Sequence, residues 1–331
     1  MTPIDPPDEL LQRLRGAERF LLSGHVNPDG DSIGSALGLV RLLARLGKMS
    51  TVWNRDETPA VYRVLPGADR IHVGDVPPVA DLQEHFDVIV TLECPSLERS
   101  GLEQALDAGL PILNLDHHLG NENYGEVNWV DTGAPALGEM ILRLSRALGV
   151  PLTSEAATVL LVALSSDTGG FRFANATTRA FEAGARLVTA GGDPTDVSKW
   201  LHESQPEPSV RLLGEMLASL ELSGGGRVAS VLLTKEMFAR AGASTAHSEG
   251  LINHPRSIAG VDAVVLVREL DPGECKVSLR SRGALDVERI ARRHSGGGHR
   301  NAAGFVAEGD SKSVRERAVR ELCTEIEDDE V

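Results

Sequence analysis

Short apolar runs alternate with amphipathic segments across residues 8–192 of the chain. Each run has the length of a strand that is buried on both faces. Predicted strands lie at 18–25, 49–54, 86–93 and 110–116, and predicted helices at 8–19, 32–47, 136–149, 154–167 and 177–192. This alternation predicts an α/β domain with a mostly parallel sheet flanked by helices. In such sheets, ligands bind beyond the carboxyl ends of the strands.

The pattern changes after residue 192, where the first predicted domain (1–192) ends. Residues 193–221 contain a helix on each side of a proline-containing break, which predicts a helical connector. Three strand-like runs follow, and residues 286–308 then have the pattern of a helix, a glycine-rich loop and a strand. We therefore predict a smaller α/β domain at 222–324, a cleft between the domains, and an acidic tail at 325–331 that is frayed.

Composition removes several classes of function. The 33 Lys and Arg against 48 Asp and Glu give a net charge of −15, which argues against long duplex DNA and anionic membranes as partners. No apolar run reaches the ~20 residues of a membrane span. The N-terminal residues lack the features of a signal peptide. The three cysteines are far apart, which argues against disulfides or a thiolate zinc site and fits a cytoplasmic protein.

Polar clusters follow three predicted strands and end one predicted helix. They comprise His25, Asp29 and Asp31; Glu93; Asp116, His117 and His118; and Asp167. The first three have a simpler alternative: Asp31 or Ser32 as a helix cap, Glu93 as a solvated residue, and 116–118 as a surface loop. Asp116 could instead accept a hydrogen bond from a histidine and fix its tautomer. Asp167 opposes a helix dipole, which suggests a compensating cation.

Taken together, these clusters predict a metal site. So many carboxylates around one crevice would repel one another unless cations neutralise them. Carboxylate and imidazole ligands suit Mn²⁺ or Mg²⁺. Two such ions about 3.5–4 Å apart, bridged by a carboxylate, would activate water for attack at phosphorus.

Five segments resemble one known family. HVNPDGDSIGS, the DHH triplet at 116–118 and SSDTGGFRF are similar to motifs of the DHH phosphoesterase superfamily. GGGHRNAAGF (296–305) and KVSLRSRG (276–283) resemble its DHH-associated C-terminal domain. The length and the two-domain plan resemble the branch that contains nanoRNases and pAp phosphatases.

The resemblance implies a site with two Mn²⁺ ions, with Mg²⁺ or Co²⁺ as alternatives. His25 and Asp29 would bind the first ion, and Asp31, His117 and Asp167 the second. Glu93 stands where the family usually has a bridging Asp, and its extra methylene puts the metal spacing in question. His118 would lie near the scissile phosphate, with Asp116 behind it. These three adjacent residues, Asp116, His117 and His118, form the predicted catalytic group.

The second domain carries its own anion-binding signal. Residues 276–305 hold seven Lys and Arg against two acidic residues, a local charge of +5. Glycines 296–298 can present backbone N–H groups to an anion. The resemblance implies that the substrate is bound by residues near this loop, with Arg99 as a further candidate from the first domain. The predicted set is Arg99, Arg280, Ser281, Gly297, Gly298, His299 and Asn301.

These features predict a metal-dependent hydrolase of short single-stranded RNA, linear dinucleotides or pAp. One alternative is a cyclic-dinucleotide phosphodiesterase. Another is a non-catalytic nucleotide-binding protein whose site has decayed at Glu93. With 12 aromatic residues, a large base-stacking surface is not expected. A homodimer is compatible with the sequence.

Overall fold

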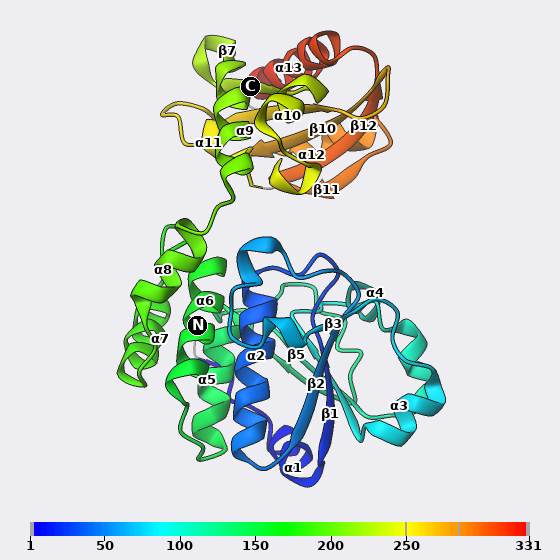
Figure 1. Ribbon diagram of the computed structural model, residues 1–331, viewed down its shortest axis with the longest axis vertical. Helices are drawn as coiled ribbons and strands as arrows, with labels where there is room; N and C mark the ends of the chain where they lie inside the picture. Colours follow the sequence, from blue (N-terminus) through cyan, green and yellow to red (C-terminus); the bar gives the residue numbers. More distant parts are fainter. Residues whose placement is uncertain (1–2, 249, 284, 329–331) are drawn as a thin grey trace. The chain divides into compact units, whose positions relative to one another are not determined.

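The computed structural model describes residues 3–248, 250–283 and 285–328. The chain forms two compact units that divide between Ser204 and Gln205 (Figure 1). This point lies inside the segment 193–221 that the sequence assigns to a connector. Helix α8 (Pro194–His202) belongs to the first unit, and α9 (Glu207–Ala218) belongs to the second.

The first unit is built on a six-stranded sheet in which every neighbouring pair is parallel, as predicted. Its strands are β1 (Arg19–Ser23), β2 (Met49–Asn54), β3 (His72–Val73), β4 (Val88–Leu92), β5 (Ile112–Asp116) and β6 (Val127–Val130). Their order is β3-β2-β1-β4-β5-β6. The second predicted strand has its predicted bounds, and β3 and β6 are additions to the prediction.

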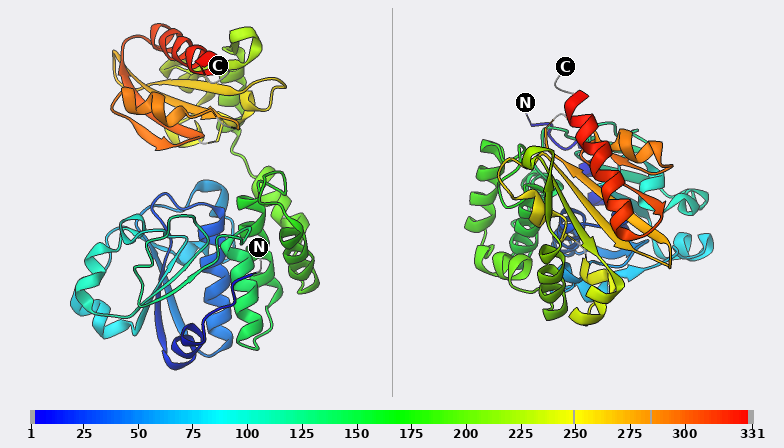
Figure 2. Two further views of the ribbon diagram at one scale, coloured as in Figure 1. Left: turned by 180° about the vertical axis from the view of Figure 1, so that it is seen from behind. Right: turned by 90° about the horizontal axis from the view of Figure 1, so that it is seen from above.

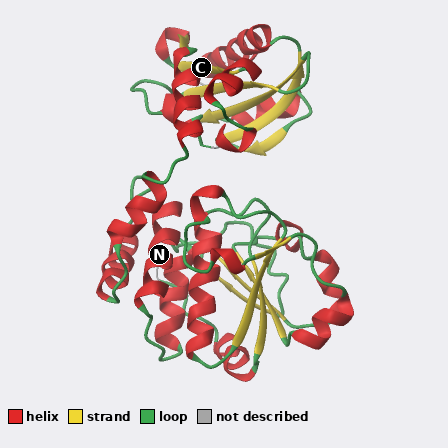
Figure 3. Ribbon diagram, viewed as in Figure 1, coloured by secondary structure: helices red, strands yellow, loops and turns green. Residues whose placement is uncertain are grey.

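Helices cover both faces of this sheet (Figures 1 and 3). One face packs against α2 (Gly30–Arg45), α5 (Leu137–Ala147) and α6 (Ser154–Asp167), and the other against α3 (Val79–His85) and the 3₁₀ segment Glu103–Ala108. Phe20 and Leu22 enter the first core, and Leu21 enters the second. Because both faces are buried, the centre of β1, residues 20–22, is continuously apolar rather than alternating. Helices α1 (Asp8–Gly16), α4 (Leu97–Ser100) and α7 (Thr178–Thr189) complete the helical layers.

The strand order places a topological switch point between β1 and β4. The chain leaves β1 toward β2 on one side, whereas β4 and β5 lie on the other. Connections that diverge in this way leave a crevice at the carboxyl ends of the two central strands. The segments after β1, β4 and β5 therefore meet there, and they carry all of the predicted metal ligands except Asp167, which ends α6.

The second unit has a mixed sheet of order β11-β12-β10-β9-β8-β7. Its strands are β7 (Glu221–Ser223), β8 (Val228–Leu233), β9 (Ala263–Glu269), β10 (Glu274–Ser281), β11 (Gly297–His299) and β12 (Ala302–Glu308). Helices α9 and α10 (Lys235–Ala241) share one core with the sheet, and Leu251 and Ile252, directly before α11 (Asn253–Arg256), also belong to it. Helices α12 (Val287–Arg293) and α13 (Ser311–Asp328) share the other, and α13 lies along the sheet (Figure 2).

Helix α13 extends further than the sequence suggested. Residues 325–328, predicted to belong to a frayed tail, are its last turn. Ile326 is buried in the core, and Glu325 forms ion pairs with Arg289 and Arg293 of α12 at 3.1 and 3.0 Å. These contacts hold the turn despite its acidic composition. Residues 329–331 lie outside the described part of the chain. None of the described helices combines the length and apolar character needed to cross a bilayer.

Candidate metal centre

The loop after β1 orients its two side chains through local hydrogen bonds. Asp29 is the N-cap of α2, and its Oδ1 accepts from the backbone N–H groups of Asp31 and Ser32, both at 3.0 Å. The cap is therefore Asp29, not Asp31 or Ser32. His25 is buried, with Nδ1 2.8 Å from the Val26 carbonyl oxygen and Nε2 3.7 Å from Oδ1 of Asp29. The Nε2 atom thus points toward the carboxylate.

Asp31 is held by a second helix. It is fully buried, and its oxygens accept from the backbone N–H groups of Leu137 (2.6 Å) and Gly138 (3.0 Å) at the start of α5. The Ser35 hydroxyl donates to it from 2.8 Å. Burial raises the pKa of Asp31, and this effect exceeds the opposing influence of His117. A buried carboxylate at two helix N-termini is rigidly placed, which suits a metal ligand.

The DHH triplet uses its Asp to orient the histidines. Oδ1 of Asp116 accepts from the backbone N–H of His117 (2.8 Å) and from both N–H (3.2 Å) and Nδ1 (2.8 Å) of His118. Oδ2 accepts from Nδ2 of Asn121 at 2.6 Å. Nδ1 of His117 lies 3.1 Å from the Ala134 carbonyl oxygen. Each imidazole therefore has Nδ1 engaged and Nε2 left for a ligand.

Glu93 follows β4 in a left-handed backbone conformation with φ of +62°. Its side chain is 1% exposed, and neither carboxylate oxygen forms a hydrogen bond within the described structure. Nε2 of His117 also lacks an aligned hydrogen bond within the described structure, although it lies 2.9 Å from Oε1 of Glu93. Among the described residues, Oε1 of Glu93 and Nε2 of His117 have only each other as close partners, and Oε2 of Glu93 has none. Buried polar atoms are nearly always well paired, so this cluster requires an explanation.

The predicted ligands form three groups whose donor atoms lie within 4.8 Å of one another. The groups are His25, Asp29 and Glu93; Asp31, His117 and Asp167; and Glu93, His117 and His118. Nε2 of His117 lies 3.7 Å from Asp31 Oδ2 and 3.8 Å from Asp167 Oδ2. All donors are nitrogen or oxygen atoms, which fits Mn²⁺ or Mg²⁺. Glu93 belongs to two groups, so its longer side chain reaches both.

The directions of the pKa shifts in the cluster also fit a site that binds cations. Burial, reinforced by the charge of Asp31, raises the pKa of Glu93 well above its usual range and that of Asp167 to about 6. Burial acts to lower the pKa of His117, but the carboxylates of Glu93, Asp31 and Asp167 outweigh it and raise the pKa to about 11. In this state His117 carries the proton that a bound cation would replace.

Two asparagines that sequence reasoning missed support this cluster. Nδ2 of Asn175 lies 3.1 Å from Asp167 Oδ2 and 3.0 Å from the Pro135 carbonyl oxygen. It thus links a metal-ligand candidate to the segment that leads into α5. Asn121 holds Asp116 in the same way. Both lie a few residues after a predicted ligand, and that proximity is the only signal of them in the sequence.

In the second unit, Arg280 is the predicted residue best placed to bind an anion. It lies in β10, and no carboxylate pairs with it among the described residues. Burial, together with the nearby charge of Arg256, lowers its pKa. Three other basic residues of the +5 segment form ion pairs within the second unit: Arg289 and Arg293 pair with Glu325, and Arg292 pairs with Glu288.

Ser281 and Asn301 lie beside Arg280 but face inward. The Ser281 hydroxyl donates to the Leu285 carbonyl oxygen (2.7 Å) and accepts from Nδ2 of Asn301 (2.8 Å). Asn301 also reaches the carbonyl oxygens of Gly283 and Leu285, both at 3.3 Å. These side chains therefore hold the loop after β10.

The glycine segment forms the edge strand β11. Gly298 has φ of +147°, and an added Cβ would meet the Ala302 carbonyl oxygen at 2.4 Å, so only glycine fits there. The space around Gly297 is open. The side chain of His299 lies outside what the structure describes. Arg99, in the first unit, is exposed near His25, and its carbonyl oxygen accepts from Val26.

Comparisons with known proteins agree with this architecture. The model of the DHH family, N-terminal domain, matches residues 19–164, and that of the DHHA1 domain matches 213–328. The chain is 34% identical over 326 residues to the bifunctional oligoribonuclease and PAP phosphatase NrnA of Thermus thermophilus, covering 96% of this chain and 93% of that protein. It is 26% identical to the protein of the same name from Bacillus subtilis, covering 89% and 91%.

Solved structures show the same fold. An exopolyphosphatase-related protein from Bacteroides fragilis aligns with a TM-score of 0.86 and 26% identity, covering 96% of this chain and 95% of that one. RecJ of Thermus thermophilus in complex with Mn²⁺ aligns with a TM-score of 0.50 and 16% identity, covering 96% and 53%. With both family models matched in order and a 34% identical relative aligned over nearly its whole length, this chain belongs to the DHH phosphoesterase family and carries a C-terminal DHHA1 domain.

Proposed function

We propose that the protein hydrolyses phosphoester bonds in short oligoribonucleotides, linear dinucleotides and 3′-phosphoadenosine 5′-phosphate, using two divalent cations. The observation that carries the proposal is the carboxylate of Glu93, which is buried between two groups of metal-ligand candidates and has His117 as its one close polar partner among the described residues. The names of the NrnA relatives, oligoribonuclease and PAP phosphatase, support the choice of substrates.

In this proposal the three groups of donor atoms form two metal sites. His25 and Asp29 would hold one ion, and Asp31, His117 and Asp167 would hold the other. Glu93 belongs to one group with His25 and Asp29 and to another with His117, so it would be available to both ions. Mn²⁺ is the preferred ion, because the donors are a mixture of carboxylate oxygens and imidazole nitrogens. Bound ions would supply an activated water and offset the charge of the phosphate.

His118 is proposed to act on the substrate directly. Its Nδ1 donates to Asp116, so its Nε2 is left to contact the phosphate or the leaving oxygen. The side chain is 45% exposed, unlike that of His117, and a substrate can therefore reach it. Burial acts to raise the pKa of Asp116, but the hydrogen bonds from His118 and Asn121 outweigh it and lower the pKa. The carboxylate stays ionised and fixes the imidazole.

The far end of the substrate is proposed to bind the second unit. Arg280 supplies a guanidinium group that no described carboxylate neutralises. Edge strand β11 (Gly297–His299) has no partner among the described strands on its outer side, and a backbone N–H group that faces that side would be available to an anion. Ser281 and Asn301 fix the loop beside Arg280 rather than bind directly. A terminal phosphate is the ligand that matches this set.

The test is a substrate profile with the purified protein and Mn²⁺. Ribonucleotides of two to twenty residues, pAp, and linear and cyclic dinucleotides are assayed side by side. We expect turnover to be highest for chains of two to five nucleotides and for pAp, and low for the longest chains and the cyclic forms. Absence of turnover of dimers, pAp and linear dinucleotides with Mn²⁺, Mg²⁺ and Co²⁺ would contradict the proposal.

A further inference from the structure

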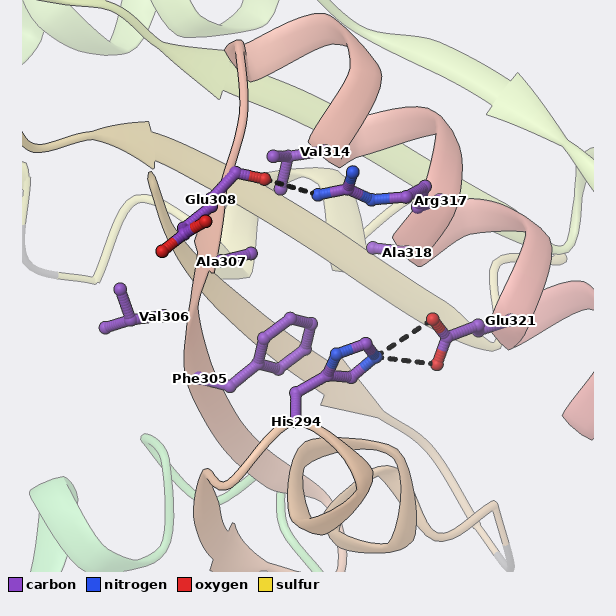
Figure 4. Close-up of a pocket in the computed structure, with 9 residues that line it drawn as sticks. All are labelled: His294, Phe305, Val306, Ala307, Glu308, Val314, Arg317, Ala318 and Glu321. Atoms are coloured by element: carbon purple, nitrogen blue, oxygen red, sulfur yellow. Dashed lines mark hydrogen bonds and ion pairs between the residues drawn. The ribbon is translucent and has the colours of Figure 1, made fainter. Parts of the chain in front are cut away.

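A clamp of three side chains lies directly before the glycine segment of the second unit (Figure 4). His294 follows the last residue of α12, and its ring stacks on Phe305 of β12, with 4.3 Å between the centroids and 12° between the planes. Its Nε2 lies 2.9 and 3.0 Å from the two oxygens of Glu321 on α13. One imidazole thus joins α12, β12 and α13.

The chain between this clamp and the glycine segment has little freedom. Ser295 adopts a left-handed conformation with φ of +57°. The N–H of Gly296 donates to the Ala291 carbonyl oxygen at 2.9 Å, and an added Cβ there would meet the Gly304 carbonyl oxygen at 2.3 Å. Gly297–His299 then pairs with β12. Because two tightly constrained residues connect His294 to β11, a displacement of the imidazole is transmitted to β11.

The clamp borders a cavity rather than a fully packed core. A cavity of about 320 Å³ lies between β12 and α13, lined by His294, Phe305, Val306, Ala307, Glu308, Val314, Arg317, Ala318 and Glu321 (Figure 4). The pair of His294 and Glu321 spans this space. When a side chain is lost from the wall of a cavity, the surroundings fill the gap only in part.

We propose that His294 is a positioning residue for substrate binding, which it controls by holding the glycine segment through Glu321 and Phe305. The inference rests on the proposed function, in which Gly297 and Gly298 bind the terminal phosphate. His294 does not touch the substrate. Its loss therefore weakens binding and leaves the chemical step at the metal centre unchanged.

The chain offers a matched control on the same two helices. Glu325 of α13 pairs with Arg289 and Arg293 of α12, but it makes no contact with His294 in the described structure. Glu325→Ala removes two ion pairs between α12 and α13 and leaves the clamp intact. If the clamp only stabilised the packing of these helices, Glu325→Ala and Glu321→Ala would act alike.

The experiment compares His294→Phe, Glu321→Ala, Glu321→Gln and Glu325→Ala in the full-length protein. His294→Phe keeps the ring stack and removes Nε2, and Glu321→Gln keeps an acceptor oxygen. For pApA with Mn²⁺, we expect His294→Phe and Glu321→Ala to raise KM about tenfold, as for loss of a hydrogen bond to a charged group, with kcat changed less than twofold. Glu321→Gln is expected to stay within threefold of the wild-type KM, and Glu325→Ala within twofold.

A second measurement separates this inference from the proposed function. The affinity for 5′-AMP is measured by calorimetry in EDTA, where the metal centre contributes nothing. We expect His294→Phe to weaken AMP binding about tenfold and Glu325→Ala to leave it unchanged. A wild type that hydrolyses no nucleotide would overturn the proposed function, and the AMP measurement would still test the clamp. Equal AMP affinity in wild type and His294→Phe, no AMP binding by the wild type, or equal KM effects of Glu321→Ala and Glu325→Ala, would overturn the inference.

Discussion

Glu93→Gln tests whether the buried carboxylate serves the metal centre or the fold. The substitution keeps the shape of the side chain and removes its charge. In the metal-free protein, burial and the charge of Asp31 raise the pKa of Glu93 well above its usual range, so the folded state disfavours the ionised form. The nearest polar partner of Glu93 among the described residues is Nε2 of His117, 2.9 Å from Oε1, and a glutamine keeps an oxygen in that place. We therefore expect the metal-free variant to melt at the same temperature as the wild type or at a higher one.

The effect of Mn²⁺ should change in the opposite direction. At a Mn²⁺ concentration of about 100 times Kd, binding stabilises the wild type by about 2.7 kcal/mol. For a domain of roughly 150–250 residues this raises Tm by about 5–11 °C. If loss of the shared ligand weakens affinity about 100-fold, the same Mn²⁺ concentration stabilises the variant by only about 0.4 kcal/mol, or about 1 °C.

The assay is a thermal melt of each protein in EDTA and in Mn²⁺. Glu98→Gln is the matched control, because Glu98 is exposed five residues further along the chain and the substitution changes the net charge equally. This control should reproduce both wild-type values. The reasoning would be refuted if Glu93→Gln melted several degrees lower in EDTA and kept the full Mn²⁺ shift. Glu93 would then stabilise the fold rather than bind the metal ions.

Three further predictions concern other residues. Carboxylates raise the pKa of metal-free His117 to about 11, so Mn²⁺ binding at pH 7.5 should release about one proton from this imidazole, and the apparent affinity for Mn²⁺ should rise with pH. Binding heats that are the same in buffers of different ionisation enthalpy would contradict this proton release. Asn175→Ala should weaken Mn²⁺ binding at least about tenfold, because it frees Asp167, and unchanged affinity in a Mn²⁺ titration would argue against this role. Arg280→Met should raise KM for a 5′-phosphorylated dinucleotide about 10- to 100-fold, but alter KM little for the same dinucleotide without that phosphate.

The metal-ligand candidates could be located from the sequence because they are tied to local patterns. His25, Asp29, Asp31 and Glu93 follow continuously apolar strands, and the carboxyl ends of parallel strands meet at one edge. The switch point between β1 and β4 then brings them together. Strand β2 and helix α6 were also predicted at their observed bounds.

The supporting contacts could not be predicted because they join residues far apart in the chain. The backbone N–H groups of Leu137 and Gly138 hold Asp31 from a separation of over one hundred residues. His294 and Glu321 meet only because α12 and α13 share a core. The last turn of α13 looked like an acidic tail, since the pattern of charges does not show that Glu325 has two arginine partners.

The inward orientation of Ser281 and Asn301 illustrates the same limit. A short motif specifies which residue types occur near a binding loop, but not which of them face the ligand. In the structure both side chains form hydrogen bonds that hold the loop after β10, whereas Arg280 has no carboxylate partner in the described chain. Motif and structure together therefore select Arg280 as the phosphate ligand to test.

Anomalous scattering at the Mn absorption edge, from crystals grown with Mn²⁺, tests the two-metal account most directly. We expect two peaks about 3.5–4 Å apart, one contacted by His25 and Asp29 and the other by Asp31, His117 and Asp167, with Glu93 touching both. A single peak, or two peaks of which neither contacts Glu93, would contradict the central claim.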